Sequence, residues 1–157
     1  MLKHSHTILV VDDDPVNLKM LERLLKRDFR VLTADDGKRA LEILQTEPIS
    51  LIMTDQQMPD MSGVELLLKS RAINESIVRM VVTADRDSKT FVEAIRSAGA
   101  ARVITKPWDP DRVLQDVRES LDRYTLEAAR TQAIEQLKQT NQELKKMVRR
   151  KQNIETL

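Results

Sequence analysis

Charged and hydroxyl side chains follow several short apolar runs of this sequence. Asp12 and Asp13 follow one run, Asp55 follows another, and Thr83 and Lys106 come at the ends of two more. Carboxylates packed together repel one another, so such a cluster tends to hold a cation or to raise a pKa. A site built only from oxygen ligands suits Mg²⁺, which keeps several waters and completes its shell with phosphate oxygens.

Phosphoryl transfer is the chemistry that these residue types serve together. Mg²⁺ neutralises charge on a phosphoryl group and aligns the group for in-line attack. An aspartate carboxylate can itself be the nucleophile and form an aspartyl phosphate. Lys106 can then pair with one phosphate oxygen as a point charge, and Thr83 can donate a hydrogen bond to another.

Strands must bring these side chains together. Short apolar runs predict buried strands at residues 8–11, 29–34, 49–54, 77–83 and 101–105, with helical apolar spacing between them. Strand alternating with helix predicts a parallel sheet covered on both faces. Ligands bind such sheets at the carboxyl ends of the strands, where the strand order reverses. We therefore expect the carboxylates, the hydroxyl and the ammonium to share one shallow site.

Apolar residues at helical spacing mark five helices between and after the strands. In the first helix Val16, Met20 and Leu24 share a face, with Leu21 and Leu25 beside them. The later helices are marked by Ala40, Leu41 and Leu44; Val64, Leu67 and Leu68; Phe91, Val92 and Ile95; and Val113, Val117, Leu121 and Tyr124.

Local features mark two helix ends. Asp14 stands before Pro15, which predicts an N-cap followed by a proline in the first helical position. Gly99 stands where a helix is expected to end, at the position that favours glycine.

Composition excludes several other kinds of site. The 157 residues carry 26 Lys and Arg against 25 Asp and Glu, so the net charge of +1 indicates neither nucleic acid nor membrane. The absence of cysteine excludes disulfides, thiol nucleophiles and cysteine-ligated zinc. The three glycines are too far apart for a glycine-rich nucleotide loop. With no signal peptide and no apolar run long enough to span a bilayer, a cytoplasmic protein is expected.

Four segments in order along the chain resemble the signature blocks of response-regulator receiver domains. They are ILVVDDDP at 8–15, MTDQQMPDMSG at 53–63, VVTAD at 81–85 and ITKPW at 104–108. The resemblance covers about residues 7–124. It implies a flavodoxin-like α/β fold, with a doubly wound, five-stranded parallel sheet in the order 2-1-3-4-5.

The resemblance implies a role for each matching residue in a phosphorylation cycle. Asp55 would accept phosphate from a phosphohistidine on a sensor histidine kinase or a phosphotransfer protein. Thr83 and Lys106 would be the switch hydroxyl and the phosphate-binding lysine. The family often has Tyr or Phe three residues before this lysine, where this chain has Val103. An inward-swinging aromatic ring is therefore not the readout here.

The resemblance also implies a magnesium cofactor. Asp12 and Asp13 would be the acidic pair that serves Mg²⁺, with Asp13 as a direct ligand. Asp55 and the main-chain carbonyl of Gln57 would complete the protein ligands. The chain would then be a signalling domain that promotes its own phosphorylation and dephosphorylation, and not an enzyme with a separate substrate.

The composition changes near residue 124. We expect a receiver domain at 1–124 and an extended helix at 125–157, since the latter stretch lacks glycine, proline and aromatic residues. A heptad begins at Ile134, with Asn141 at an a position, and predicts a parallel homodimer through residues 134–155. The basic side chains near the end have no aromatic residues between them, so a solvated face is expected and no direct contact with nucleic acid.

Helices of this kind in the family lead to an output domain, and residues 125–157 contain none. Two interpretations stay open: the helix joins the receiver to an output domain outside these residues, or the coiled coil is itself the output. In either case we expect phosphorylation to act through this helix.

Two alternatives come from other classes of protein. Asp12 and Asp14 resemble the nucleophile motif of haloacid dehalogenase-like phosphatases, but Pro15 and Val16 follow where Gly-Thr is usual, and Asp55 would have no role. A receiver-like scaffold that dimerises without cycling phosphate is the other alternative. The complete set of acidic residues, hydroxyl and lysine argues against it.

Overall fold

The structure is a computed structural model that describes residues 5–84 and 89–155, apart from the side chains of Thr90, Phe91, Ala94 and Ile95. The chain divides into two compact units, Met1–Leu121 and Asp122–Leu157. None of the helices within the described residues combines the length and hydrophobicity that a membrane span requires.

The first unit is built on a five-stranded parallel sheet. Its strand order is β2-β1-β3-β4-β5, which confirms the predicted flavodoxin-like topology. Every strand begins and ends within two residues of its predicted position. The strands are β1 (Thr7–Val11), β2 (Arg30–Ala34), β3 (Leu51–Asp55), β4 (Val78–Thr83) and β5 (Arg102–Thr105).

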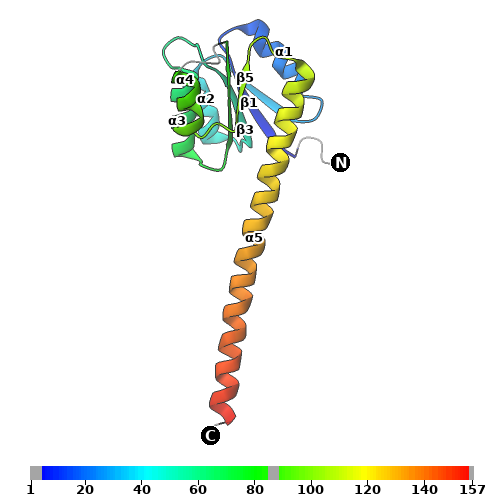
Figure 1. Cartoon of the computed structure of the whole chain (residues 1–157), viewed down its shortest axis with the longest axis vertical. Coiled ribbons are helices and arrows are strands. Elements are labelled where there is room, and N and C mark those ends of the chain that lie inside the picture. Colours follow the sequence, from blue (N-terminus) through cyan, green and yellow to red (C-terminus); the bar gives the residue numbers. More distant parts are fainter. Residues whose placement is uncertain (1–4, 85–88, 156–157) are drawn as a thin grey trace. The chain divides into compact units, whose positions relative to one another are not determined.

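Helices cover both faces of this sheet. Helices α2, α3 and α4 lie along one face, and α1 and the first turns of α5 lie along the other (Figure 1). Because side chains alternate along a strand, Leu9 and Val11 of β1 pack toward α2 and α3, whereas Ile8 and Val10 pack toward α1 and α5. The helices are α1 (Pro15–Leu25), α2 (Gly37–Thr46), α3 (Gly63–Ile73), α4 (Lys89–Arg96) and α5 (Pro110–Glu155).

The apolar residues that predict α1 do not all pack on the core, although the helix itself is confirmed at Pro15–Leu25. Val16 is 63% exposed and Met20 is 50% exposed, while Leu21 and Leu25 are almost completely buried. Two adjacent ladders of apolar residues, spaced four apart, compete in this helix, and the one that carries Leu21 and Leu25 faces the sheet. The other ladder leaves Val16 and Met20 at the surface.

Helices α3 and α4 each also expose one of the apolar residues that mark them. In α3, Leu68 is 42% exposed because Leu66 and Leu67 are the leucines that pack on the sheet. In α4, Val92 is 46% exposed, and the side chains of Phe91 and Ile95 lie outside the described residues.

The predicted N-cap of α1 is confirmed. The Asp14 carboxylate accepts a hydrogen bond of 2.9 Å from the backbone N–H of Val16, and Pro15 is the first residue of α1. Helix α4 ends at Arg96, three residues before Gly99, so Gly99 lies in the turn after the helix. Its φ of 65° is a left-handed conformation that glycine adopts without strain.

The burial of helix α5 changes along its length. Val113, Val117 and Leu121 are buried, as their spacing predicts, and Tyr124 is half-buried. From Thr125 to Glu155 every residue is exposed.

Candidate functional site

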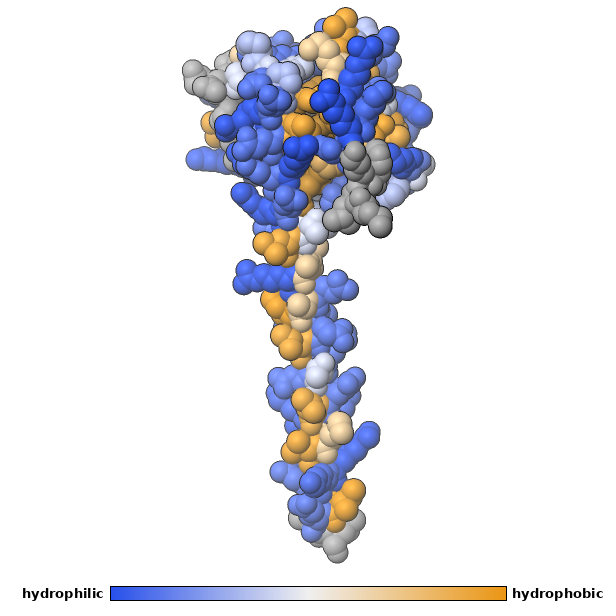
Figure 2. Space-filling model, turned by 90° about the vertical axis from the view of Figure 1, so that its right-hand side faces the viewer, coloured by the Kyte–Doolittle hydropathy of each residue, from blue (hydrophilic) through white to orange (hydrophobic). Residues whose placement is uncertain are grey.

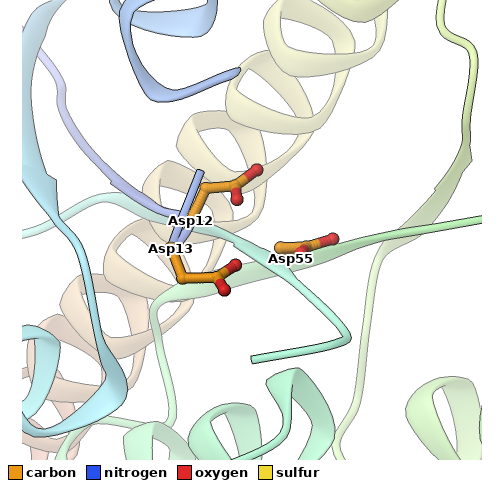
Figure 3. A group of neighbouring side chains, drawn as sticks. All are labelled: Asp12, Asp13 and Asp55. Carbon is orange, nitrogen blue, oxygen red and sulfur yellow. The ribbon is translucent and has the colours of Figure 1, made fainter. Parts of the chain in front are cut away.

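Three carboxylates meet at the carboxyl ends of β1 and β3. Asp12 and Asp13 directly follow β1, and Asp55 is the last residue of β3 (Figure 3). Each offers a carboxylate oxygen, and these oxygens all lie within 4.8 Å of one another. Because β1 and β3 are neighbours in a parallel sheet, residues 43 positions apart in sequence reach the same place.

A lysine from the end of β5 pairs with this cluster. Lys106 Nζ lies 2.9 Å from Asp55 Oδ1. The backbone N–H of Lys106 donates a hydrogen bond of 2.9 Å to the carbonyl of Thr83, which joins the end of β5 to the end of β4. The lysine is therefore anchored on the same sheet edge as the carboxylates.

Burial and the neighbouring carboxylates both raise the pKa of Asp12. Its side chain is nearly inaccessible, and burial raises the pKa of its carboxyl, with the charges of Asp55 and Asp13 adding to the effect. The backbone N–H of Asp14, 2.9 Å from Asp12 Oδ1, and the Lys106 ammonium oppose this rise in pKa without cancelling it. Asp12 is thus held where its negative charge is costly without a cation.

Lys106 stays charged in this environment. Burial lowers the pKa of its ammonium, but the hydrogen bond and the charge of Asp55, together with the charges of Asp12 and Asp13, raise it by more in sum. The net result is a raised pKa, so the lysine is a fixed positive charge at neutral pH.

All of the predicted site residues line one cavity of about 220 Å³. Thr83 forms part of its wall from the end of β4, and its side chain is buried. Gln57 is exposed at the cavity rim, on the loop that follows β3. The residues around the cavity are Asp12, Asp13, Asp14, Asn17, Asp55, Gln56, Gln57, Thr83, Ala84 and Lys106.

The loop after Asp55 is tied to the start of α3. Gln56 accepts two hydrogen bonds there: its backbone carbonyl from the N–H of Gly63 at 3.0 Å, and its side-chain oxygen from the N–H of Val64 at 2.9 Å. A Cβ on Gly63 would lie 2.4 Å from the carbonyl oxygen of Asp55, so only glycine allows this approach. The helix start therefore fixes the position of Asp55.

Sequence reasoning missed three residues that contribute to the site. Gln56 was not singled out, and its place beside Asp55 was the signal for it. Asn17 lines the cavity from the first turn of α1, a place that Asp14 and Pro15 already indicated. Asp14 was interpreted only as an N-cap; it serves as one and also lines the cavity.

Val103 lies away from this cavity. It pairs with Val81 in the sheet and packs, half-buried, against the core beneath α2 and α3. An aliphatic side chain held in the core in this way provides no ring that could turn toward Thr83.

The donor set fits a divalent cation. Three carboxylates and one ammonium leave an excess of two negative charges, and every candidate ligand atom is an oxygen. Mg²⁺ binds through one or two carboxylates together with waters and phosphate oxygens, which a shallow acidic cavity allows. The cluster of Asp12, Asp13 and Asp55 could therefore bind such a metal.

Comparison with known proteins agrees with this fold and identifies the family. The sequence profile of the family described as "Response regulator receiver domain" matches residues 8–118. The hydrogenase transcriptional regulatory protein HoxA of Bradyrhizobium diazoefficiens is 34% identical over 148 residues, which are 94% of this chain and 30% of that protein. The chain thus spans less than a third of that curated relative.

Solved structures share the fold. A CheY-like response regulator receiver domain protein from Methanospirillum hungatei aligns with a TM-score of 0.74 at 30% identity, over 78% of this chain and 98% of that one. A structure described as an adenylate cyclase from Rhodopirellula baltica aligns with a TM-score of 0.77 at 31% identity, over 83% of this chain and 97% of that one. With its strand order and its profile match over residues 8–118, this chain belongs to the response regulator receiver domain family.

Proposed function

We propose that Asp55 accepts a phosphoryl group from a phosphohistidine, and that this chain is the receiver of a two-component system. The ion pair of 2.9 Å between Asp55 and Lys106 carries the proposal, because it lies beside two further carboxylates. A carboxylate paired with a lysine at the rim of an acidic cavity is a nucleophile whose product can be bound by the same lysine.

In the proposed step an oxygen of Asp55 attacks phosphorus as the phosphorus–nitrogen bond breaks. The imidazole leaves with the bonding electrons and takes up a proton, and Asp55 becomes an acyl phosphate. Lys106 then pairs with a phosphoryl oxygen, and the Thr83 hydroxyl donates to another. Mg²⁺, held by Asp12, Asp13, Asp55 and the main-chain carbonyl of Gln57, would supply neutralisation of the phosphoryl charge.

The proposed partner is a sensor histidine kinase or a phosphotransfer protein. Val16 and Met20 form an exposed apolar pair on α1, the helix whose N-cap, Asp14, lines the cavity. We propose that the phosphohistidine donor packs on this pair, and that it does so in the cytoplasm, where ATP is available to the kinase. Met20→Glu should then slow transfer from a phosphohistidine protein and leave the reaction with a small donor unchanged.

Intact mass after incubation with Mg²⁺ and a small acyl-phosphate donor tests the proposal. We expect one phosphoryl group on the wild type and none on Asp55→Asn. Asp60→Asn is the matched control, because Asp60 is an exposed aspartate of the same loop that lies outside the cavity. Omitting Mg²⁺ should slow the reaction of the wild type.

A contrary result would be equally clear. An Asp55→Asn variant that gains the same mass would remove Asp55 as the acceptor. An unmodified wild type would favour a scaffold that dimerises without cycling phosphate, or a receiver that needs a specific kinase, and transfer from a phosphohistidine protein separates the two.

A further inference from the structure

The second unit carries an apolar face that the fold of one chain does not use. Seven large apolar side chains of the described part of this unit are between 43% and 71% exposed. They gather along the helix beyond residue 122, as the hydrophobic residues in Figure 2 show. Large exposed apolar surface of this kind marks an interaction site. The residues are Leu126, Ile134, Leu137, Leu144, Met147, Val148 and Ile154.

We propose that residues 134–155 pair, in parallel and in register, with the same residues of a second copy of the chain. Ile134, Asn141 and Val148 occupy the a positions of a heptad, and Leu137 and Leu144 occupy d. An Asn at a contacts the same Asn of the second copy only when the helices are parallel and in register. Its two amides can then hydrogen-bond to each other, and the pairing excludes shifted alignments.

The charges flanking this seam favour the parallel orientation. Lys138 and Lys145 occupy e positions, whereas the g positions are uncharged, with Thr140 and Met147 among them. In a parallel pair each e side chain faces a g side chain of the second copy, so lysine meets a neutral residue. In an antiparallel pair e faces e, which brings lysines of the two copies together. Only the parallel arrangement avoids this repulsion.

The seam is short, and the pair is therefore weak. Arg130 and Lys151 fall at the d positions on either side of it, so charged residues end the apolar core at both ends. Only a few layers remain between them, one of which is Asn141. We expect a dimer that depends on concentration in the micromolar range and that attached domains can strengthen.

The match to HoxA covers 94% of this chain and so extends past residue 118, where the receiver profile ends. The similarity therefore includes part of the segment proposed to pair, and it accounts for 30% of HoxA.

Cysteine crosslinking of this chain tests the orientation, because its 157 residues include no cysteine. Under oxidation Val148→Cys, at an a position, should form a disulfide-linked dimer. Gln139→Cys, on the opposite side of the helix, should not. In antiparallel helices an a position of one copy faces a d position of the other. A mixture of the Ile134→Cys and Lys151→Cys variants would then form a disulfide between the two variants, while Val148→Cys would not link to itself. That result would overturn the proposal. Equal linkage at 148 and 139 would also overturn it.

Sedimentation equilibrium tests the stoichiometry. The wild type should pass from monomer to dimer as its concentration rises. Leu144→Asp should remove the dimer, and Lys146→Asp, an exposed control on the outer side, should not. Asn141→Leu should associate roughly tenfold more tightly and lose its fixed register or stoichiometry, because a buried amide no longer has to be desolvated. A wild type that is monomeric throughout, or trimeric, would contradict the proposal, and neither result bears on phosphorylation of Asp55.

Discussion

At the scale of single residues, the site is organised around charge that the protein alone does not neutralise. Asp12 is the most buried member of the acidic cluster, and Lys106 pairs directly with Asp55 rather than with Asp12. A cation bound beside it would therefore relieve the cost of this buried charge. This effect would link metal binding to folding stability.

The pH dependence of stability follows from the raised pKa of Asp12. Its ordinary value is 3.8, and folding raises it, so the folded protein prefers the protonated carboxyl. Asp12 then costs stability at neutral pH, and the cost disappears as the pH falls through the raised value and below the ordinary one. In metal-free buffer Asp12→Asn should be more stable than wild type at pH 7, and the difference should shrink on acidification. Urea denaturation at several pH values measures it.

The matched control for this prediction is Asp109→Asn. Asp109 is exposed, and its side chain accepts a hydrogen bond of 3.1 Å from the N–H of Asp111, much as Asp12 accepts one from Asp14. Its replacement should change stability by no more than ~0.5 kcal/mol. If Asp12→Asn were less stable than wild type at pH 7 without metal, Asp12 would not be the strained charge described here.

At the scale of elements, the start of α3 positions the nucleophile. A methyl group on Gly63 would press on the backbone of Asp55 and Gln56, neither of which can move without disturbing the site. Gly63→Ala should cost about 1–3 kcal/mol of stability, as overpacking does, and should slow phosphorylation. Gly37→Ala is the control, because its new methyl would meet only the side chain of Met61. Equal effects of the two substitutions would refute this account of Gly63.

A buried arginine ties α4 to the sheet. Arg79 is 7% exposed, and its guanidinium donates hydrogen bonds to the carbonyls of Ala98, Glu75 and Ile77 at 2.8, 3.2 and 2.9 Å. Burial lowers the pKa of this group, with the nearby Arg71 adding to the effect, so its hydrogen bonds compensate a real desolvation cost.

Arg79→Met should therefore be strongly destabilising. It would leave three carbonyls without their donor, at a cost of about 3 kcal/mol or more in urea denaturation. The exposed Arg71 donates to the Ser97 carbonyl at 3.1 Å, and Arg71→Met should cost less than ~1 kcal/mol. A small effect at Arg79 would show that other contacts hold this corner of the fold.

The elements that could be predicted are those with unambiguous local signals. Each strand has an apolar run, and four of the five runs lead to a polar residue at their carboxyl ends, so the sheet edge with Asp12, Asp55 and Lys106 followed from the sequence. The buried face of α1 did not, because two apolar ladders lie side by side and only packing on the sheet selects one. Gln56 and Arg79 were missed because their roles depend on backbone groups that are distant in sequence or lie in loops.

At the scale of the whole chain, one continuous helix connects the two units, since α5 runs from Pro110 to Glu155. The proposed phosphorylation of Asp55 would change the charge beside Lys106, which precedes this helix by four residues. We therefore expect phosphorylation to shift the monomer–dimer equilibrium of the chain. Sedimentation of wild type and Asp55→Asn, each with and without the phosphoryl donor, measures this. A shift that also appears in Asp55→Asn would show that phosphorylation of Asp55 does not cause it. No shift in phosphorylated wild type would show that phosphorylation does not affect pairing of the helix.

The central claim is the identity of the phosphorylated residue. Borohydride reduces an aspartyl phosphate to homoserine, so peptide mapping by mass spectrometry after treatment with donor, Mg²⁺ and borohydride locates the acceptor. The account predicts homoserine at position 55 and nowhere else. Homoserine at position 12 would contradict it and would instead support the phosphatase interpretation, in which the first strand supplies the nucleophile.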